Sequence, residues 1–168
     1  QFSQLDLKER ELILTTSNGT RALFACPQQS TILAGCFYNA SAVTARARAL
    51  AEERSSDIAI VCAAEYGYFA LEDTACAGYL ALELLRQQPT LTIHDSAYGA
   101  ITIHENYPAD VLIERAQSAR DLIEVGLQGD LDFCLKQNGS SSVPIVEGVE
   151  EQTGLLKLHQ MVPLKVEA

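Results

Sequence analysis

The stretch "LILTTSNGTRALFAC", residues 12–26, places a polar turn between two apolar runs. The first run, Leu12–Thr16, is rich in large aliphatic residues and predicts a buried strand. The second run, Thr20–Cys26, predicts a short helix that Pro27 ends. A strand followed by a turn and a helix is the repeating unit of α/β proteins. The stretch therefore sets the expected fold class, and its turn is the first place to look for function.

The same alternation of strand and helix continues along the chain. Asp57–Ala63 is apolar on both faces, as in a central strand of a parallel sheet. The other expected elements are strands at Thr31–Gly35, in "LDFCL" (131–135) and in "VPIVEG" (143–148), and helices at Asn39–Arg54, 71–87 and 108–126, the last with a break near Ser118. Residues 90–107 fit either a strand or a helix. The pattern predicts one α/β domain over residues 1–168, with a mostly parallel or mixed sheet and helices on both faces.

The composition argues against two classes of partner. Hydrophobic residues make up 48% of the chain and charged residues 20%, which is typical of a globular protein. The net charge is -10 and the 12 Lys and Arg residues are scattered, whereas binding to nucleic acid requires a basic stripe. No apolar run approaches the roughly 18 residues that span a bilayer. We therefore expect neither nucleic acid nor a membrane as a partner, while a small anionic ligand stays open because local donors govern a pocket.

The cysteines indicate a compartment. There are five of them, an odd number, and no two form a C-x-x-C pair. This usage favours free buried thiols in a reducing cytosol over a zinc site or a disulfide framework. We expect a cytoplasmic protein.

The turn at residues 15–21 offers groups that suit an oxyanion. Hydroxyl groups, a glycine at Gly19 and the N–H groups that begin a helix can surround a phosphate. Arg21 adds a planar guanidinium that matches the oxygens of a phosphate or sulfonate. Two other interpretations stay open. The turn can be an ordinary helix cap followed by a solvated arginine, or Asn18-Gly19-Thr20 can be a glycosylation acceptor.

Further candidate residues lie in three later segments. Asn39 either caps the following helix or donates to a ligand. Glu72 and Asp73, in the first turn of the helix expected at 71–87, either complement its macrodipole or bind a hard cation such as Mg²⁺. Arg120, near the expected helix break, either binds a second anion or makes a surface ion pair.

Taken together, these segments resemble one family, the 2-phosphosulfolactate phosphatases of coenzyme M biosynthesis. The matching motifs run in order along the chain: "TTSNGTRAL" (15–23), "GCFYNASAV" (35–43), "ALEDTACAG" (70–78), "SARDLIEVGLQGDLDFCL" (118–135) and "VPIVEG" (143–148). The resemblance implies an α/β architecture and Mg²⁺-dependent hydrolysis of 2-phospho-3-sulfolactate to 3-sulfolactate and phosphate.

The resemblance also implies roles for the candidate residues. The cradle for one anionic end of the substrate would be formed by Asn18, Gly19, Thr20 and Arg21. Asn39 would add a donor, and Arg120 would bind the second anion. Glu72 and Asp73 would hold Mg²⁺ or order the attacking water, and the metal would stabilise charge on the phosphoryl oxygens.

The sequence departs from the family pattern in two places. Family members usually carry an additional N-terminal segment with polar motifs that this sequence does not show, so we expect the chain to resemble the C-terminal two-thirds of the family. Ala119 stands where the family often has glycine. Three functions stay open: this phosphatase, a related phosphatase with another small anionic ester, and a non-catalytic anion-binding domain that retains the fold. An incomplete sheet edge would favour association with a second copy of the chain.

Overall fold

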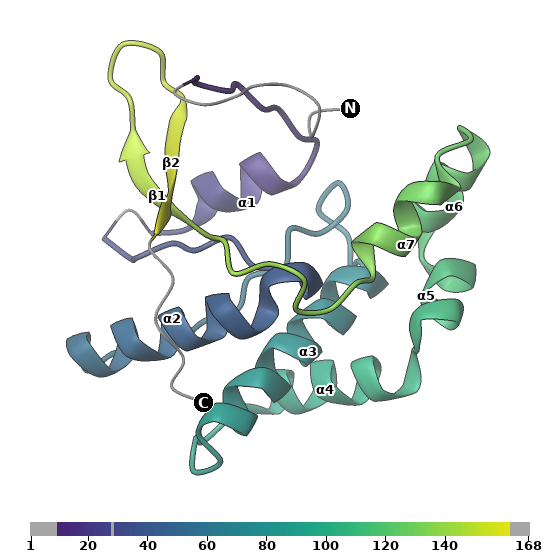
Figure 1. Cartoon of the computed structure of the whole chain (residues 1–168), viewed down its shortest axis with the longest axis horizontal. Helices are drawn as coiled ribbons and strands as arrows, with labels where there is room; N and C mark the ends of the chain where they lie inside the picture. Colours follow the sequence, from purple (N-terminus) through teal and green to yellow (C-terminus); the bar gives the residue numbers. More distant parts are fainter. Residues whose placement is uncertain (1–9, 28, 162–168) are drawn as a thin grey trace.

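The computed structural model describes residues 10–27 and 29–161, in which helices dominate (Figure 1). The helical elements are α1 (Gly19–Ala25), η2 (Phe37–Asn39), α2 (Ala40–Arg54), α3 (Leu71–Gln87), α4 (Asp95–Asn106), α5 (Ala109–Arg115), α6 (Gln117–Glu124), η3 (Gln128–Asp130) and α7 (Leu131–Cys134). Two strands, β1 (Val143–Val149) and β2 (Leu156–Met161), form an antiparallel hairpin. The fold is therefore a mixture of helices and strands.

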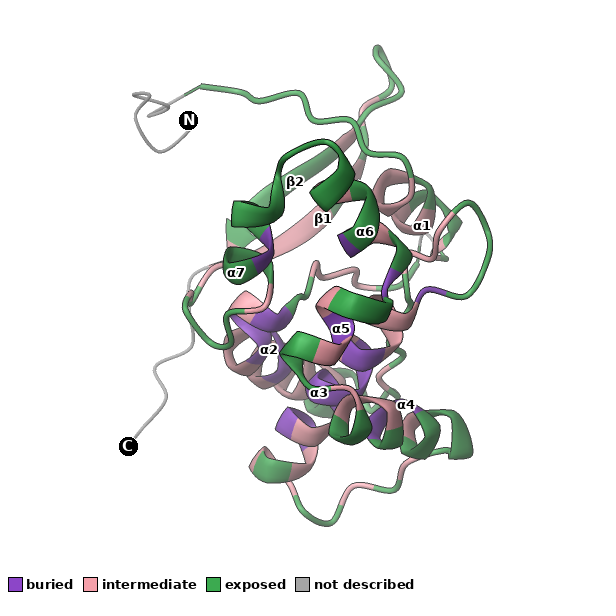
Figure 2. Ribbon diagram, turned by 90° about the vertical axis from the view of Figure 1, so that its right-hand side faces the viewer, coloured by how far each residue is buried: buried purple, intermediate pink, exposed green. Residues whose placement is uncertain are grey.

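The hydrophobic core gathers residues of η2, α2, α3, α5 and β1 around the first half of α3, and Figure 2 shows buried positions on α2 and α3. Its central cluster consists of Phe37, Ala40, Val43, Ala75, Tyr79, Leu80, Leu112 and Val143. Gly78 sets the closest approach between α3 and α4, because a Cβ atom there would overlap the carbonyl oxygen of Ala100. The absence of a side chain at Gly78 thus permits close helix-on-helix packing of α3 against α4.

The predicted helices are confirmed. The helix expected at Asn39–Arg54 is α2, which begins one residue later, and the helix expected at 71–87 is α3. The region 108–126 forms α5 and α6, with the break at Ala116 instead of Ser118. The ambiguous region 90–107 contains α4. These helices form as predicted because each satisfies its backbone hydrogen bonds within itself.

Among the described residues, three of the five predicted strands do not form. Leu12–Thr16 and Asp57–Ala63 form no strand, and they expose Ile13 and Val61 by 79% and 59%. Residues 131–135 contain the short helix α7, so the strand predicted there is wrong. The strand predicted at 143–148 is confirmed as β1. A strand needs a neighbouring backbone for its hydrogen bonds, and among the described residues neither 12–16 nor 57–63 makes a backbone hydrogen bond to another segment.

The third predicted strand, Thr31–Gly35, is extended beside β1. The Val146 N–H donates to the carbonyl of Ile32 at 2.9 Å, and the Ala34 N–H donates to the carbonyl of Pro144 at 2.9 Å. The pairing is antiparallel. Within residues 10–27 and 29–161, the mostly parallel sheet with helices on both faces is therefore not found.

The loop at 136–142 is docked onto the start of α2 by Asn138. This residue has a left-handed backbone, with φ of 53°. Its Oδ1 accepts the Ser41 N–H at 2.8 Å, and its Nδ2 donates to the Tyr79 hydroxyl at 2.8 Å. A residue far along the chain thus caps α2 and joins it to α3.

In the part of the chain that the structure describes, no helix has the length and apolar character needed to cross a membrane. All five cysteines are free thiols: Cys26 and Cys76 are half-buried, and Cys36, Cys62 and Cys134 are exposed. The expectation that all of them are buried is therefore wrong.

Candidate active site

The turn before α1 is closed by a threonine side chain. Thr16 Oγ1 accepts the Thr20 N–H at 2.9 Å and lies 3.1 Å from the Thr20 hydroxyl. Gly19 permits this closure, because a Cβ atom there would be 3.2 Å from Thr16 Oγ1. Asn18 occupies the N-cap position of α1 without making the side-chain cap bond. The turn is therefore held across Gly19 by Thr16, which leaves the Asn18 side chain for another contact.

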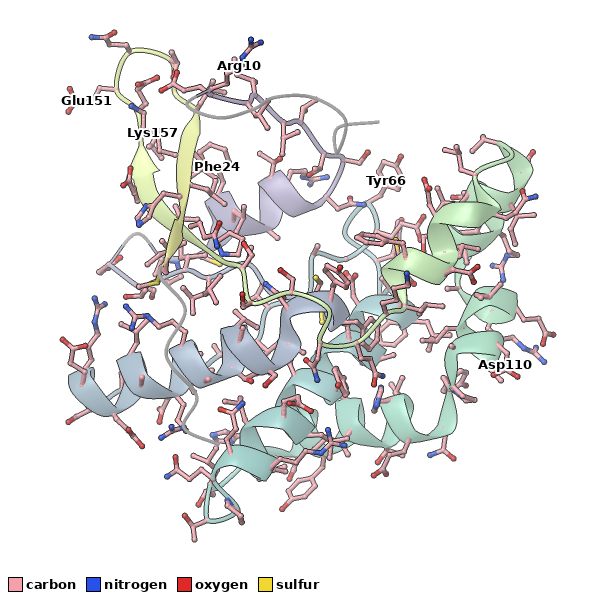
Figure 3. All side chains as sticks on the ribbon, in the orientation of Figure 1. Arg10, Phe24, Tyr66, Asp110, Glu151 and Lys157 are labelled. Atoms are coloured by element: carbon pink, nitrogen blue, oxygen red, sulfur yellow. The ribbon has the colours of Figure 1, made fainter. Side chains whose placement is uncertain are left out.

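The contact that Asn18 makes joins the turn at 15–21 to the loop at 64–69. Asn18 Oδ1 accepts the Tyr66 N–H at 3.0 Å, across 48 residues of chain. Figure 3 labels Tyr66 on the loop that reaches toward the start of α1. Arg21 follows on the exposed surface of α1 and makes no ion pair among the described residues. Arg21 is thus an exposed cationic residue three positions after Asn18.

Asp73 joins the loop at 64–69 to α3. Its Oδ2 accepts the Ala64 N–H at 2.7 Å. Burial raises the pKa of Asp73, the Ala64 N–H opposes that shift, and the neighbouring Glu72 carboxylate adds to it. Glu72 is half-buried in the same helical turn. Within the described residues, no three His, Cys, Asp or Glu side chains are grouped as metal ligands.

Two cysteines near Asp73 are held as thiols. Although Cys62 is exposed by surface area, partial desolvation and the Asp73 carboxylate both raise its pKa. Burial, with smaller contributions from Cys36 and Asp73, raises the pKa of Cys76 to about 12. Because the thiolate is the nucleophilic form, neither cysteine is activated for attack at neutral pH.

Asn39 makes three hydrogen bonds to the backbone. Its Oδ1 accepts the Cys36 N–H at 2.8 Å, and its Nδ2 donates to the carbonyls of Ala34 at 3.1 Å and Ser142 at 2.9 Å. The residue is buried. Both amide hydrogens are thus engaged in holding three segments together, and the substrate-binding role of Asn39 stays a prediction.

Arg120 lies on the exposed surface of α6. Its guanidinium donates to the carbonyl of Arg115 at 2.7 Å and to Gln117 Oε1 at 2.6 Å. A cation at this place suits the negative end of α5. None of these bonds reaches α3 or the turn before α1, so the structure does not join Arg120 to the other predicted site residues.

The structure therefore brings together one group of predicted residues through the loop at 64–69. Asn18 and Asp73 bind this loop from two sides, with Arg21 and Glu72 as their neighbours in the chain. Sequence reasoning missed the part of Tyr66 in this group. Its only signal was the Tyr66-Gly67 pair after an apolar run, because a glycine there suits a tight hairpin turn.

Hydroxyl, amide, guanidinium and carboxylate groups on neighbouring loops are the groups with which proteins handle small phosphate esters. Comparison with known proteins gives the family. The sequence profile of the 2-phosphosulpholactate phosphatases matches residues 1–148, so the chain belongs to this family.

Individual relatives agree. The chain is 31% identical over 150 residues to the 2-phosphosulfolactate phosphatase of Methanothermobacter thermautotrophicus, covering 88% of this chain and 62% of the relative. It is 33% identical over 141 residues to the probable 2-phosphosulfolactate phosphatase of Thermus thermophilus, covering 83% and 58%. It is 28% identical over 150 residues to the probable 2-phosphosulfolactate phosphatase of Clostridium botulinum, covering 88% and 61%. The chain spans about three fifths of the length of these relatives.

Proposed function

We propose that this chain carries the anion-handling part of a phosphatase that hydrolyses 2-phospho-3-sulfolactate, in coenzyme M biosynthesis, to 3-sulfolactate and phosphate. One observation carries the proposal. In a chain of this family, the bond between Asn18 Oδ1 and the Tyr66 N–H brings the turn at 18–21 beside the loop that Asp73 anchors. An anion-binding turn and a carboxylate are thus held on neighbouring loops.

The residues divide the chemistry between them. The turn at 18–21 and the Arg21 guanidinium bind and orient the anionic ester. A water molecule forms the new bond to phosphorus while the bond to the ester oxygen breaks. One proton of the water ends on the sulfolactate hydroxyl. Glu72 and Asp73 order this water. Water is the nucleophile rather than a cysteine, since the thiols of Cys62 and Cys76 are not activated.

We also propose Mg²⁺ as the cofactor. Glu72 and Asp73 supply hard oxygen donors, which suit this ion, and Mg²⁺ is often bound by one or two carboxylates together with substrate oxygens and water. Bound Mg²⁺ would supply positive charge to the phosphoryl oxygens.

A second candidate function is a non-catalytic anion-binding domain with the same fold. It is favoured by Asn39 and Arg120, whose side chains make their hydrogen bonds within the protein. Under this alternative the turn at 18–21 binds an anion without releasing phosphate. A related phosphatase with another small anionic ester is a variant of the first proposal.

The proposal extends to architecture and compartment. We propose that 12–16 and 57–63 join a mostly parallel sheet with helices on both faces in the functional protein, with residues 1–168 in one domain. The exposure of Ile13 and Val61 supports this, as it supports association with a second copy of the chain. Five free thiols support a reducing, cytoplasmic compartment.

Phosphate release from 2-phosphosulfolactate tests the proposal, measured with Mg²⁺ and with EDTA for this chain and for a protein of the relatives' full length. We expect Mg²⁺-dependent release that Arg21→Ala reduces about 100-fold, with Arg115→Ala as the matched exposed control. Saturable binding of phosphate or sulfolactate without any release, in both proteins, would establish the binding domain instead.

A further inference from the structure

The loop at 64–69 contains an unusual concentration of left-handed backbone. Ala64, Tyr66 and Gly67 have φ angles of 63°, 51° and 88°. The Glu65 N–H donates to the Tyr68 carbonyl at 3.1 Å, and the Tyr68 N–H donates back to the Glu65 carbonyl at 2.8 Å. Tyr66 and Gly67 are therefore the two central residues of a hairpin turn. Positive φ at both positions is the type I′ geometry, in which Asn-Gly is strongly preferred to Tyr-Gly.

A tyrosine in this backbone region needs support from its surroundings. A left-handed conformation is unfavourable for a non-glycine residue, and such residues persist only where neighbouring structure holds them. In this loop both left-handed residues other than glycine are held in the same way. The Ala64 N–H donates to the Asp73 carboxylate of α3, and the Tyr66 N–H donates to the Asn18 carboxamide before α1.

The hydrogen bonds to Ala64 and Tyr66 come from different parts of the chain and lie on either side of Glu65. Asp73 fixes the loop on the side of α3, and Asn18 fixes it on the side of the anion-binding turn. Glu65 lies between the two anchored amides, and its backbone also closes the turn. Loss of the Asn18 bond would leave Tyr66 without the contact that offsets its strain, and the turn would lose its fixed position beside the start of α1.

We propose that Asn18 is a positioning residue, which acts through the Tyr66 amide by holding the turn at 65–68 against the turn before α1. Its Oδ1 serves the loop rather than the substrate. The kinetic consequence of this inference rests on the proposed phosphatase function. The structural consequence, an ordered turn at Tyr66-Gly67, does not.

The structural consequence is tested by hydrogen exchange of the peptide covering 64–69 in the intact chain. Asn18→Ala should speed exchange there by about tenfold, the effect of losing one supporting hydrogen bond. Asn106→Ala, which removes an exposed bond to the Thr102 carbonyl within α4, is the matched control and should leave this peptide unchanged. Exchange in α3 reports whether the variant remains folded.

A rescue variant separates positioning from direct contact. Tyr66→Asn creates the preferred pair of a type I′ turn, so Asn18→Ala with Tyr66→Asn should restore slow exchange. In a preparation that releases phosphate, Asn18→Ala should lower kcat/KM about tenfold, and the added Tyr66→Asn should recover most of it.

Two results would overturn the inference. One is unchanged exchange at 64–69 in Asn18→Ala, whatever the activity. The other is a double variant with a restored turn but no recovery of kcat/KM, which would show that Asn18 contacts the substrate directly. If no preparation releases phosphate, the proposed function fails while the exchange experiment still decides the role of Asn18.

Discussion

The helical layer of α2, α3 and α4 and the extended segments at 12–16 and 57–63 both carry aliphatic side chains, yet they differ in how deeply these are buried. Val43 in α2 is 5% exposed, whereas Val61 in the second segment is 59% exposed. A helix closes its hydrogen bonds locally and needs a neighbour only for its apolar face. An extended segment needs a neighbour for its backbone as well. The comparison shows that apolar sequence alone does not bury a strand.

The largest effect is expected where the helical layer is tightest. Gly78→Ala should destabilise the chain by about 3 kcal/mol, because the new Cβ would collide with the Ala100 backbone and force α3 and α4 apart. Gly99→Ala is the matched control on α4, since no atom outside the adjoining helix backbone lies within 4 Å of the place that its new methyl group would take. Urea unfolding of both variants measures the difference. Equal stability of the two would refute the close packing of α3 on α4.

A smaller loss of stability is expected from Asn39, whose side chain joins the start of α2 to two other segments. Asn39→Ala should cost about 2 kcal/mol, because it leaves the Cys36 N–H and the carbonyls of Ala34 and Ser142 without their partner. Thermal unfolding measures this loss, with Asn106→Ala as the exposed control. A stable Asn39→Ala variant that has lost only ligand binding would instead favour the substrate-binding prediction.

Matched valine substitutions test the comparison most directly. Val43→Thr should cost about 1.5 kcal/mol, because it buries a hydroxyl group. Val61→Thr should change the free energy of unfolding by less than about 0.5 kcal/mol, since the side chain already faces solvent. Denaturant titration of both variants gives the two values. A loss at Val61 as large as that at Val43 would show that the segment at 57–63 is buried in solution.

The smallest effect is a pH dependence of the stability, caused by Asp73, which joins α3 to the residue after the segment at 57–63. Burial raises the pKa of Asp73, so the folded chain binds this proton more tightly than the unfolded chain does. The resulting stabilisation is fully present below the ordinary Asp value of 3.8 and is lost as pH rises through the folded pKa. The stability of wild type relative to Asp73→Asn should therefore fall as the pH rises above the ordinary value of 3.8. Melting temperatures across this range measure the fall, with Asp110→Asn on the exposed surface of α5 as the control.

The sequence predicted what depends on local patterns. The bounds of α2 and α3, and the division of 108–126 into two helices, followed from periodicity and from Pro108 and Gly126. The position of the turn before α1 and the carboxylates in the first turn of α3 were likewise visible in the sequence. The bond from Asn18 to Tyr66 and the cap that Asn138 provides for α2 were not, because they join residues 48 and 97 positions apart. No local pattern encodes which distant amide a side chain will meet.

The docking of Asn138 onto α2 also has a consequence for the order of folding. Ser41 receives its cap from a residue 97 positions later, and Asn39 is tied to Ser142 across 103 positions. Closing loops of this length carries a large entropic cost before any contact offsets it, whereas the turn between α3 and α4 is short. The helical layer can therefore assemble early, and the start of α2 becomes locked only when the last third of the chain arrives. During synthesis, the beginning of α2 has to wait for a residue that the ribosome has not yet made.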